Sequence, residues 1–443
     1  MSPETEAPGR AGVATSIKPR RHRRGVMGIR RSRFVATSAG LLLVIVLASC
    51  GGSDDETGGR TQVEFFQFKG EAVATFDGLI EQFEAENPEI DIVQNNVPNA
   101  DAVLRTRLVK NDVPELMSLN GNGGTYGDLA LAEVFRDFTG DPALEGISEG
   151  SLEVLDGLGH VEGEINGVPL ANNADGIIYN ADLFEELDLS VPRTWDELID
   201  VAEEIQAAGL VPFYHTWKEA WTTLPPFNPL AQNVPQEDFW ELRVADETSF
   251  SEEYPEVAER LLELKQYGPD DPFRFDYNTG NRAIADGEAV MYLQGIWAIP
   301  TIRSINPDVN LGVFPFPTTN DVERNRLVSG VDILLTMPRE ATEHADEALT
   351  FIRWMTEPTN AKQYADEQVH FSAVDGVEQE DPALAPLNPE FETGNIVGFA
   401  DHNIPSSIPL ENLLQAFLID ENVEGLLADL DERYDAVQAR RGL

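Results

Sequence analysis

The stretch that decides the fold is residues 176–198. Its first part, residues 176–184, reads GIIYNADLF, and its last part, residues 191–198, reads VPRTWDEL. The apolar run before Asn180 predicts a buried strand, and the Asn180 side chain can cap a helix that follows it. A strand that leads directly into a helix is the repeating unit of an α/β fold.

The last part of this stretch predicts the start of a longer helix. Thr194 and Glu197 have the spacing of a capping box, in which two side chains satisfy backbone N–H groups at a helix start. The residues that would share the apolar face of this helix are Leu198, Val201, Ala202 and Ile205. Gly209 is expected to end it.

The alternation of strands and helices continues in both directions from this stretch. The predicted elements are strands at 63–68, 90–93, 115–119 and 290–293, and helices at 71–86, 103–110 and 346–355. The third strand runs into a Gly-rich stretch, residues 120–124. This stretch lacks the Gly and Lys spacing of phosphate-binding loops, so we expect a strand-to-helix turn at a ligand cleft.

Composition excludes several classes of protein. The 443 residues carry a formal net charge of -47, with 78 Asp and Glu against 31 Lys and Arg. Clustered basic residues occur only before residue 34, which argues against a nucleic-acid partner. A single Cys rules out a disulfide framework, and the six His show no metal-ligand spacing. No metal site is therefore expected.

The N-terminus has the three parts of an export signal. Residues 1–33 contain nine basic residues, residues 34–49 contain no charge, and residues 47–50 read LASC. The apolar run is too short for an ordinary membrane-spanning helix. Residues 27–49 alone make a compact signal, so translation from Met27 is a second possibility that the sequence leaves open.

Residues 47–53 resemble the lipobox of bacterial lipoproteins, because small residues precede the chain's only Cys. The resemblance implies a signal peptide at 1–49, cleavage before Cys50, and lipid attachment to Cys50. Residues 50–60, rich in Gly, Ser and acidic side chains, would be a flexible tether. The protein would then be held on the outer face of the cytoplasmic membrane.

Most of the remaining chain resembles the extracellular solute-binding proteins of family 1, the carbohydrate-binding subunits of bacterial ATP-driven importers, and is similar to maltose-binding protein. The motifs that carry this resemblance lie at 160–170, 176–198, 283–297, 312–317 and 329–335. Each motif is degenerate, but their joint order from residue 61 to the C-terminus is specific. The resemblance implies a sugar ligand, a membrane permease with cytoplasmic ATPases as partners, and no enzymatic activity. No cofactor is expected in this chain, because those ATPases would supply the energy. A monomer is expected.

The implied fold is two α/β lobes of the periplasmic-binding-protein type II class, with a ligand cleft between them and several hinge crossings. Lobe one would be 61–171 plus 325–371, and lobe two would be 172–324 plus 372–443. The crossings would then lie near 170–173, 325–330 and 370–374. Several thin connections permit a hinge to close while they limit its direction.

A sugar site needs flat aromatic side chains against the C–H faces of the ring and polar groups around its edge. Trp297, preceded by Gly295 in a turn, lies where the family places a sugar-stacking Trp. His215, Trp217 and Trp221 lie in residues 212–229, which are rich in Pro and are predicted to be irregular. By contrast, Trp195, Trp240 and Trp354 fall in helical patterns and are predicted to be packing residues.

The predicted polar contacts follow strand ends and crossings. They are Phe68 and Lys69 after the first strand, Asn120 after the third, Asn172 and Asn173 at the first crossing, and Asp401 in the C-terminal region together with His402 and Asn403.

Two alternative functions stay open. One is a secreted glycosidase with a pair of acidic residues, although no barrel pattern or hydrolase motif is present. The other is a binding protein for polyamines, iron complexes, glycerophosphodiesters or peptides.

Overall fold

The computed structural model of the protein describes residues 59–97 and 99–441. The predicted signal at 1–49, the second start at Met27, Cys50 and residues 51–58 of the tether lie outside them. Arg60, predicted as the last tether residue, instead pairs with Glu84 at 2.6 Å and with Asp91 at 3.3 Å. Arg60 is therefore part of the folded body, and the prediction for this residue is corrected.

The described residues form a mixed sheet of ten strands. The strands are β1 (Thr61–Gln67), β2 (Ile90–Asn96), β3 (Leu116–Leu119), β4 (Val168–Asn180), β5 (Val211–Phe213), β6 (Ala289–Gly295), β7 (Leu311–Pro315), β8 (Leu327–Thr336), β9 (Phe371–Ser372) and β10 (Ile396–Val397). The main order is β2-β1-β3-β8-β4-β6-β5, with β10 beside β8, and β7 and β9 beside β4. β1 pairs in parallel with β2 and β3, whereas β8 and β4 are antiparallel to each other.

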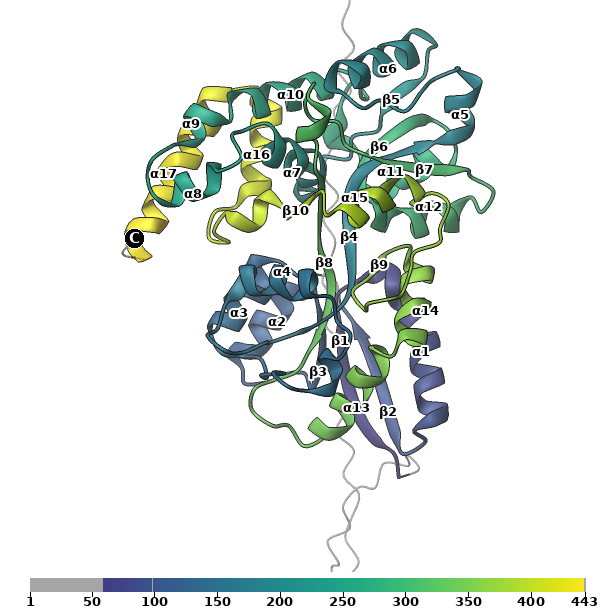
Figure 1. Cartoon of the computed structure of the whole chain (residues 1–443), viewed down its shortest axis with the longest axis vertical. Helices are drawn as coiled ribbons and strands as arrows, with labels where there is room; N and C mark the ends of the chain where they lie inside the picture. Colours follow the sequence, from purple (N-terminus) through teal and green to yellow (C-terminus); the bar gives the residue numbers. More distant parts are fainter. Residues whose placement is uncertain (1–58, 98, 442–443) are drawn as a thin grey trace, which may run out of the picture. The chain divides into compact units, whose positions relative to one another are not determined.

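Helices cover both faces of this sheet (Figure 1). Those before β6 are α1 (Val73–Glu86), α2 (Ala100–Val109), α3 (Asp128–Leu131), α4 (Glu149–Gly159), α5 (Ala181–Glu186), α6 (Trp195–Ala207), α7 (Leu224–Asn233), α8 (Phe239–Val244), α9 (Phe250–Glu253), α10 (Pro255–Lys265) and α11 (Tyr277–Ala285). Those after β6 are α12 (Ile299–Ile305), α13 (Ala345–Met355), α14 (Pro358–Gln368), α15 (Asn388–Thr393), α16 (Leu410–Asp420) and α17 (Val423–Arg441).

The β1–β3 part of the sheet lies between two layers of helices. In β1, Phe65 packs into a core with α1, α13 and α14, while the next residue, Phe66, packs into a core with α2, α3 and α4. Successive side chains of a strand point to opposite faces, so one buried strand supplies both cores. Figure 1 shows these two helix groups on either side of β1 and β3.

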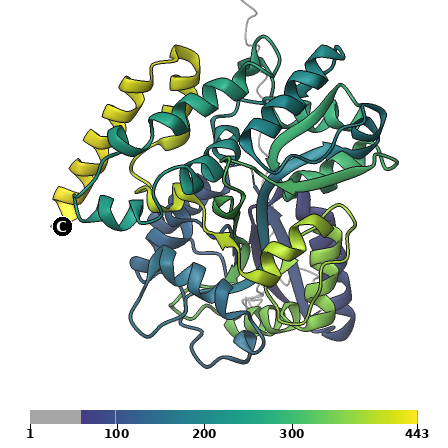
Figure 2. The ribbon, with the colours of Figure 1, turned by 45° about the horizontal axis from the view of Figure 1, so that its top comes forward.

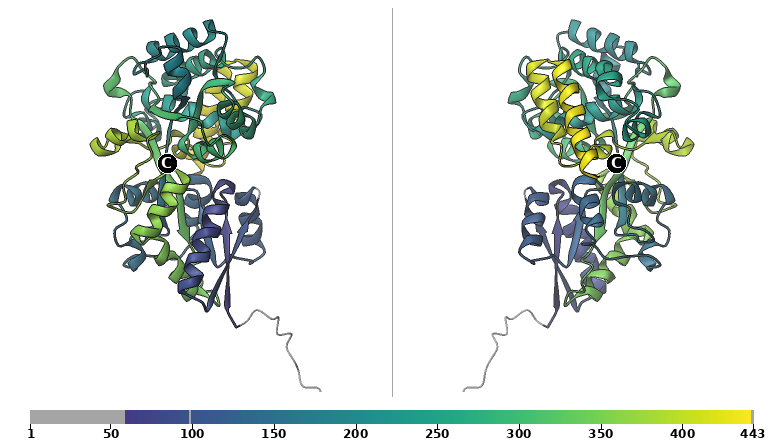
Figure 3. Two further views of the ribbon diagram at one scale, coloured as in Figure 1. Left: turned by 90° about the vertical axis from the view of Figure 1, so that its right-hand side faces the viewer. Right: turned by 90° about the vertical axis from the view of Figure 1, so that its left-hand side faces the viewer.

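A second pair of cores lies beyond β4 and β8. One contains buried residues from 177–316 and 400–434, and the other contains buried residues from 174–327 and 369–387. The C-terminal helices α16 and α17 belong to the first of these and lie beside α9 and α10 in Figures 2 and 3. We call the two cores on either side of β1 the N-terminal group, and the two cores described here the C-terminal group.

Strands β4 and β8 run through both groups. The first half of β4, Val168 to Asp175, pairs with β8, and its second half, Asp175 to Asn180, lies between β6 and β7. Figure 1 shows both strands in the middle of the described body. The two groups of cores therefore share one continuous sheet.

Most predicted elements are found with shifts of a few residues at their ends. The first strand is β1, the helix at 71–86 is α1 preceded by a short turn, Gly70–Ala72, and the helix at 346–355 is α13. Asn180 caps α5 as predicted, because its side chain accepts a hydrogen bond from the Leu183 N–H at 3.1 Å. The prediction for residues 212–229 is wrong, since they form the end of β5, the turn Ala220–Thr223 and the start of α7.

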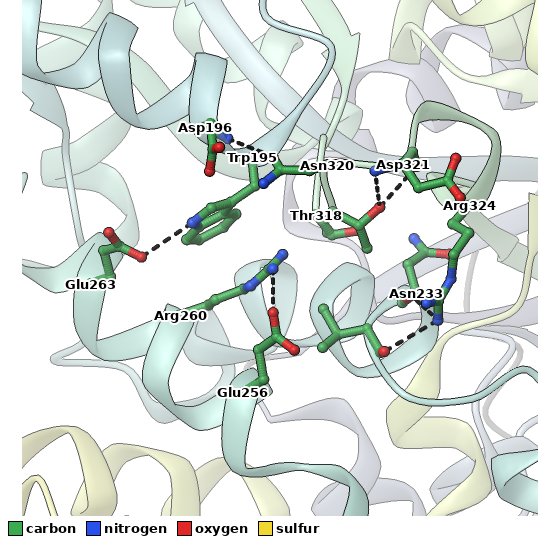
Figure 4. A network of polar contacts seen from close by, with 12 residues as sticks. Trp195, Asp196, Asn233, Glu256, Arg260, Glu263, Thr318, Asn320, Asp321 and Arg324 are labelled. Atoms are coloured by element: carbon green, nitrogen blue, oxygen red, sulfur yellow. Dashed lines mark hydrogen bonds and ion pairs between the residues drawn. The ribbon is translucent and has the colours of Figure 1, made fainter.

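The predicted capping box at the start of α6 is present in altered form. Thr194 Oγ1 accepts from the Glu197 N–H at 3.3 Å, but the Glu197 carboxylate accepts from the Arg193 N–H rather than from Thr194. Trp195 then packs as predicted, with its indole N–H donating to Glu263 at 3.1 Å and Arg260 lying 4.7 Å from its ring centre (Figure 4). This network fixes the entry of α6 into the C-terminal core.

Among residues 59–97 and 99–441, the structure contains no helix that combines the length and the apolar character needed to cross a bilayer.

Candidate functional site

A cavity of about 880 Å³ lies where the two groups of cores meet. Its N-terminal wall is formed by residues after β1, at the start of α2 and after β3. Its C-terminal wall is formed by residues of β4, the Ala220–Thr223 turn, α7, the start of α11, the turn Ile296–Ala298, and residues 399–411. β8 contributes Val331 and Asp332 between these walls. The cavity is large enough for a small oligosaccharide.

Aromatic side chains form much of the C-terminal wall. Trp221 and Tyr277 lie with ring centres 5.1 Å apart, and Trp297 and Phe399 also line the cavity. Trp297 is half-buried and packs on the core behind it. On the N-terminal wall the aromatic residue is Phe68. Such rings offer flat apolar faces, which is what the C–H face of a sugar requires.

Gly295 fixes the position of Trp297. A Cβ atom on Gly295 would lie 1.8 Å from Cζ3 of the Trp297 ring. Only a residue without a side chain leaves room for the ring against the end of β6. Gly295 itself does not line the cavity, so its function at the site is to position Trp297.

A buried polar network forms the floor of the cavity on β8. Lys69 Nζ donates to Asp332 Oδ2 at 2.5 Å, and His370 Nε2 lies 3.1 Å from the same oxygen. The other carboxylate oxygen accepts from Asn173 Nδ2 at 3.1 Å, and Asn120 donates to the Asp332 backbone carbonyl at 2.9 Å. Burial alone would raise the pKa of Asp332, but the Lys69 and His370 charges hold it well below its ordinary value. Both carboxylate oxygens of Asp332 therefore have partners within the protein.

The opposite situation holds for a second group of oxygens. Within the described residues, Asn173 Oδ1, both carboxylate oxygens of Asp175 and Asp401 Oδ1 are buried and have no hydrogen-bond donor. All three residues line the cavity. Buried polar atoms without partners are rare in folded proteins because each is costly, so this group indicates a place where a ligand supplies donors.

Three titratable side chains that line the cavity have shifted pKa values. Burial and then the Asp401 charge raise the pKa of Asp175 well above its ordinary value. The pKa of Glu411 is also raised, first by burial and then by Asp401 and Asp101. Burial lowers the pKa of His402, which Asp401 only partly opposes. Perturbed titratable groups that face a cavity are typical of functional sites.

The structure brings seven of the predicted ligand residues to this cavity: Phe68, Lys69, Asn120, Asn173, Trp221, Trp297 and Asp401. His402, named with Asp401 in the sequence analysis, also lines it. Their contact with a ligand stays a prediction, but they come from six separate parts of the sequence and meet at one place.

Three predicted residues are corrected. Trp217 is 1% exposed and stacks on His215 with ring centres 4.2 Å apart, and His215 donates from Nε2 to the Leu264 carbonyl at 2.9 Å. Both belong to the C-terminal core, and neither lines the cavity. Asn172 faces the other side of β4, where its side chain bonds the Ser151 hydroxyl at 2.9 Å. Alternation along the strand places Asn173, and not Asn172, at the cavity.

Sequence reasoning missed several lining residues, among them Asp175, Glu219, Tyr277, Asp332 and Phe399. The signal for Asp175 was present, since it lies two residues after Asn173 in a strand and so faces the same side. The signal for Asp332 was a charged residue inside the apolar run of residues 329–335. No local pattern marks Glu219 or Tyr277.

The Gly-rich stretch serves as the turn that was predicted. Asn120 lines the cavity, and the Asn122 side chain accepts from the Thr125 N–H at 2.7 Å at the start of a helical turn, Gly123–Gly127. In the part of the chain that the structure describes, no group of three or more His, Cys, Asp or Glu side chains could hold a metal ion.

Comparison with known proteins decides the family. Residues 69–362 match the family described as bacterial extracellular solute-binding protein. The chain belongs to this family. It is 28% identical over 416 residues to the multiple sugar-binding protein of Streptococcus mutans, covering 90% of this chain and 96% of that one. It is 23% identical to the melibiose/raffinose/stachyose-binding protein MelE of Bacillus subtilis, over 73% of this chain and 77% of that one.

Solved structures of solute-binding proteins share the fold. The binding protein RafE in complex with raffinose superimposes with a TM-score of 0.74 and 26% identity, covering 85% of this chain and all of RafE. The form of RafE without ligand from Streptococcus pneumoniae gives a TM-score of 0.71 and 25% identity, over 86% of this chain and 98% of that one. The resemblance read from the sequence and the two-lobe α/β fold of solute-binding proteins are thereby confirmed.

Proposed function

We propose that the protein is a sugar-capturing lipoprotein that closes two lobes around an oligosaccharide and delivers it to the permease of an ATP-driven importer. The observation that carries this proposal is the cavity, which is lined both by Trp221, Tyr277 and Trp297 and by unpartnered acceptor oxygens of Asn173 and Asp175. Aromatic faces and acceptors together suit a neutral sugar, whose ring has apolar faces and a belt of hydroxyl donors. The ligands named for similar proteins, raffinose and stachyose among them, belong to this class.

The predicted lobes become part of this proposal. The N-terminal and C-terminal groups of cores divide near the predicted crossings, because Ala171 and Ile333 pack on one side while Ala174 and Leu327 pack on the other. β4 and β8 connect the groups as continuous strands, and their division points would be the hinges. A ligand that contacts both walls makes more contacts when the lobes are closed. It therefore binds the closed form more tightly and shifts the equilibrium toward it.

A thermal-shift screen followed by calorimetry tests the ligand class. We expect raffinose, stachyose, melibiose or maltotriose to raise the melting temperature, because ligand at 100 times its Kd adds about 2.7 kcal/mol of stability. Spermidine, glycerophosphocholine and a tripeptide serve as probes of the non-sugar alternatives. Stabilisation by one of these and by no sugar would contradict the proposal.

The enzyme alternative has a direct test. Prolonged incubation of the protein with each sugar that binds should leave the sugar unchanged by chromatography. Appearance of shorter products would favour a glycosidase, which needs a suitable pair of carboxyl groups at the scissile bond.

The anchor is tested with Cys50, which lies outside the described residues. Cys50→Ser removes the thiol that would carry the lipid, so the protein should appear in the soluble fraction or stay uncleaved at its signal. Two acyl chains are needed for lasting attachment, so loss of both should release it. Processed Cys50→Ser protein that stays at the membrane would contradict the proposed anchor. Sugar affinity should be unchanged.

A further inference from the structure

Among the buried oxygens without a partner in the cavity, those of Asn173, Asp175 and Asp401 are carbonyl or carboxyl oxygens, whereas the Tyr277 hydroxyl can donate as well as accept. Asn173 donates its amide N–H to Asp332, which orients its own oxygen, Oδ1, away from that bond. Asp175 lies in the middle of β4, opposite Val328 of β8 and Gly295 of β6, and is 2% exposed. Asp401 lies in the turn Ala400–Asn403, whose backbone is held by Asn228 at 3.0 Å. The four oxygens on Asn173, Asp175 and Asp401 are therefore free to accept hydrogen bonds from a ligand.

The protein itself offers Asp175 no compensation. The cation that lines the cavity, Lys69, is already engaged by Asp332 and lies 4.0 Å from Glu71. The further carboxylates that line it, on Asp101, Glu219, Asp401 and Glu411, add negative charge. A buried carboxylate without donors costs folding free energy, and a neighbouring carboxylate increases that cost. A purely structural residue at this position would be neutral or paired.

We infer that Asp175, with Asp401 and Asn173 beside it, is a specificity-determining residue that accepts hydrogen bonds from two neighbouring hydroxyl groups of the bound sugar. The inference rests on the proposed function and adds that Asp175 lowers the stability of the unliganded protein while it raises the affinity for sugar. Asp175 destabilises the unliganded protein and is retained because it strengthens binding. A substitution at Asp175 should therefore change stability and affinity in opposite directions.

The test is Asp175→Asn, which keeps the size of the side chain and replaces one acceptor by a donor. The melting temperature of the unliganded protein should rise by a few degrees, because an ionisable carboxyl that is buried without donors beside Asp401 is replaced by an amide that cannot ionise. Affinity for the sugar that the wild type binds in the screen, with raffinose as the first probe, should fall about 10- to 100-fold by calorimetry.

Two matched substitutions serve as controls. Asp332→Asn alters a buried carboxylate that is partnered, so the unliganded protein should melt at a lower temperature because Lys69 loses its counter-ion. Asp308→Asn alters an exposed carboxylate outside the cavity, and both stability and affinity should match the wild type.

Each outcome bears on the inference. A higher melting temperature together with weaker binding supports it. Unchanged affinity would overturn it. The Asn side chain has only one acceptor oxygen, so equal affinity would show that the sugar does not donate to both carboxyl oxygens of Asp175. A lower melting temperature, or failure to fold, would also overturn it by showing a structural function for Asp175. If the wild type binds none of the sugars, the proposed function fails, which is a different result from wild-type binding with an unaltered Asp175→Asn.

Discussion

Asp175 and Asp332 are buried aspartates on neighbouring strands whose surroundings differ completely. Asp332 on β8 accepts from Lys69 and Asn173 and contacts His370, whereas Asp175 on β4 has no donor within the described residues. The pKa of the first is lowered despite burial, and that of the second is raised by burial. A carboxyl group in a cavity wall can therefore either stabilise the fold or be available to bind a ligand. Whether the protein itself supplies its hydrogen-bond donors distinguishes these two functions.

Trp297→Ala should remove one wall of the cavity. We expect affinity for the bound sugar to fall about 30- to 1,000-fold, because a stacked aromatic in a desolvated site contributes strongly to binding. Calorimetry measures this loss. The matched control is Trp240→Ala, since Trp240 is also half-buried but does not line the cavity, and it should reduce stability without changing affinity. Unchanged affinity with a large loss of stability in Trp297→Ala would remove Trp297 from the site.

Gly295→Ala supplies an independent check on the same wall. The added methyl group cannot coexist with the Trp297 ring in its present place, so affinity should fall although no ligand contact is altered directly. In the Trp297→Ala background the same substitution should change affinity little, and such non-additivity is the sign of a positioning residue.

His215 should make the protein sensitive to acid. Burial lowers the pKa of His215 to about 4 from an ordinary value of 6.5. Below pH 6.5 the unfolded chain binds a proton that the folded chain excludes, so this contribution is complete above pH 6.5 and is lost as pH falls toward 4. The loss is about 3 kcal/mol.

Urea unfolding of the wild type and His215→Gln at pH 7.5, 5.5 and 4.5 measures this effect. Other groups titrate over the same range, so the informative quantity is the difference in free energy of unfolding between the two proteins at each pH. That difference should shift in favour of the variant as the pH falls. A difference that is constant with pH would contradict the prediction.

At the scale of elements, α7 explains why residues 212–229 were predicted to be irregular. Three prolines in six positions normally argue against a helix, yet Pro225 and Pro226 occupy the first helical turn, where the missing N–H groups have no partner in any case. Pro229 lies inside the helix, and every residue from Pro225 to Asn233 is buried. Burial on all sides outweighs local propensity, and no single-sequence pattern carries that information.

Thr194→Ala tests the start of α6. The Thr194 hydroxyl accepts from the Glu197 N–H, so its removal leaves a helix donor without its cap. We expect a loss of about 1 kcal/mol in the free energy of unfolding, measured by urea denaturation. Thr194→Ser keeps the oxygen and should restore most of the stability. Equal losses in both variants would show that packing of the methyl group, and not the cap, is responsible.

At the scale of the whole molecule, a hydrogen bond joins the start of α3, in the N-terminal group of cores, to the segment that leads into α16, in the C-terminal group. Ser406 donates to Asp128 at 2.7 Å, and Arg105 contacts the same carboxylate at 3.2 Å. If the lobes close as proposed, this bond favours the closed form. Ser406→Ala should therefore weaken sugar binding up to about fivefold, through faster dissociation in stopped-flow measurements. The control is Ser304→Ala, which removes an exposed hydroxyl outside the cavity and should leave sugar binding unchanged.

The sequence predicted the strands and capped helices well because each has a local cause, such as the apolar run before Asn180 or the acceptor on Thr194. It also located Phe68, Lys69 and Asn120, since residues that follow neighbouring strands meet at one edge of a sheet. It could not locate Glu219 or Tyr277, whose positions depend on contacts between distant segments, and it left unused the signal of a charged Asp332 inside an apolar run. His215 and Trp217 were misplaced because their burial comes from α10 and the core around it.

The position of β8 in the sheet has a consequence for how the protein is made. Lys69 meets Asp332 across 263 residues of sequence, and Asn120 meets it across 212. A nascent chain that has reached α11 still lacks the strand that completes the N-terminal half of its sheet, so that half cannot assemble during most of synthesis. Long-range pairing of this kind is slow. For a chain exported as proposed above, late completion of this sheet is compatible with passage through the membrane before the N-terminal half has folded.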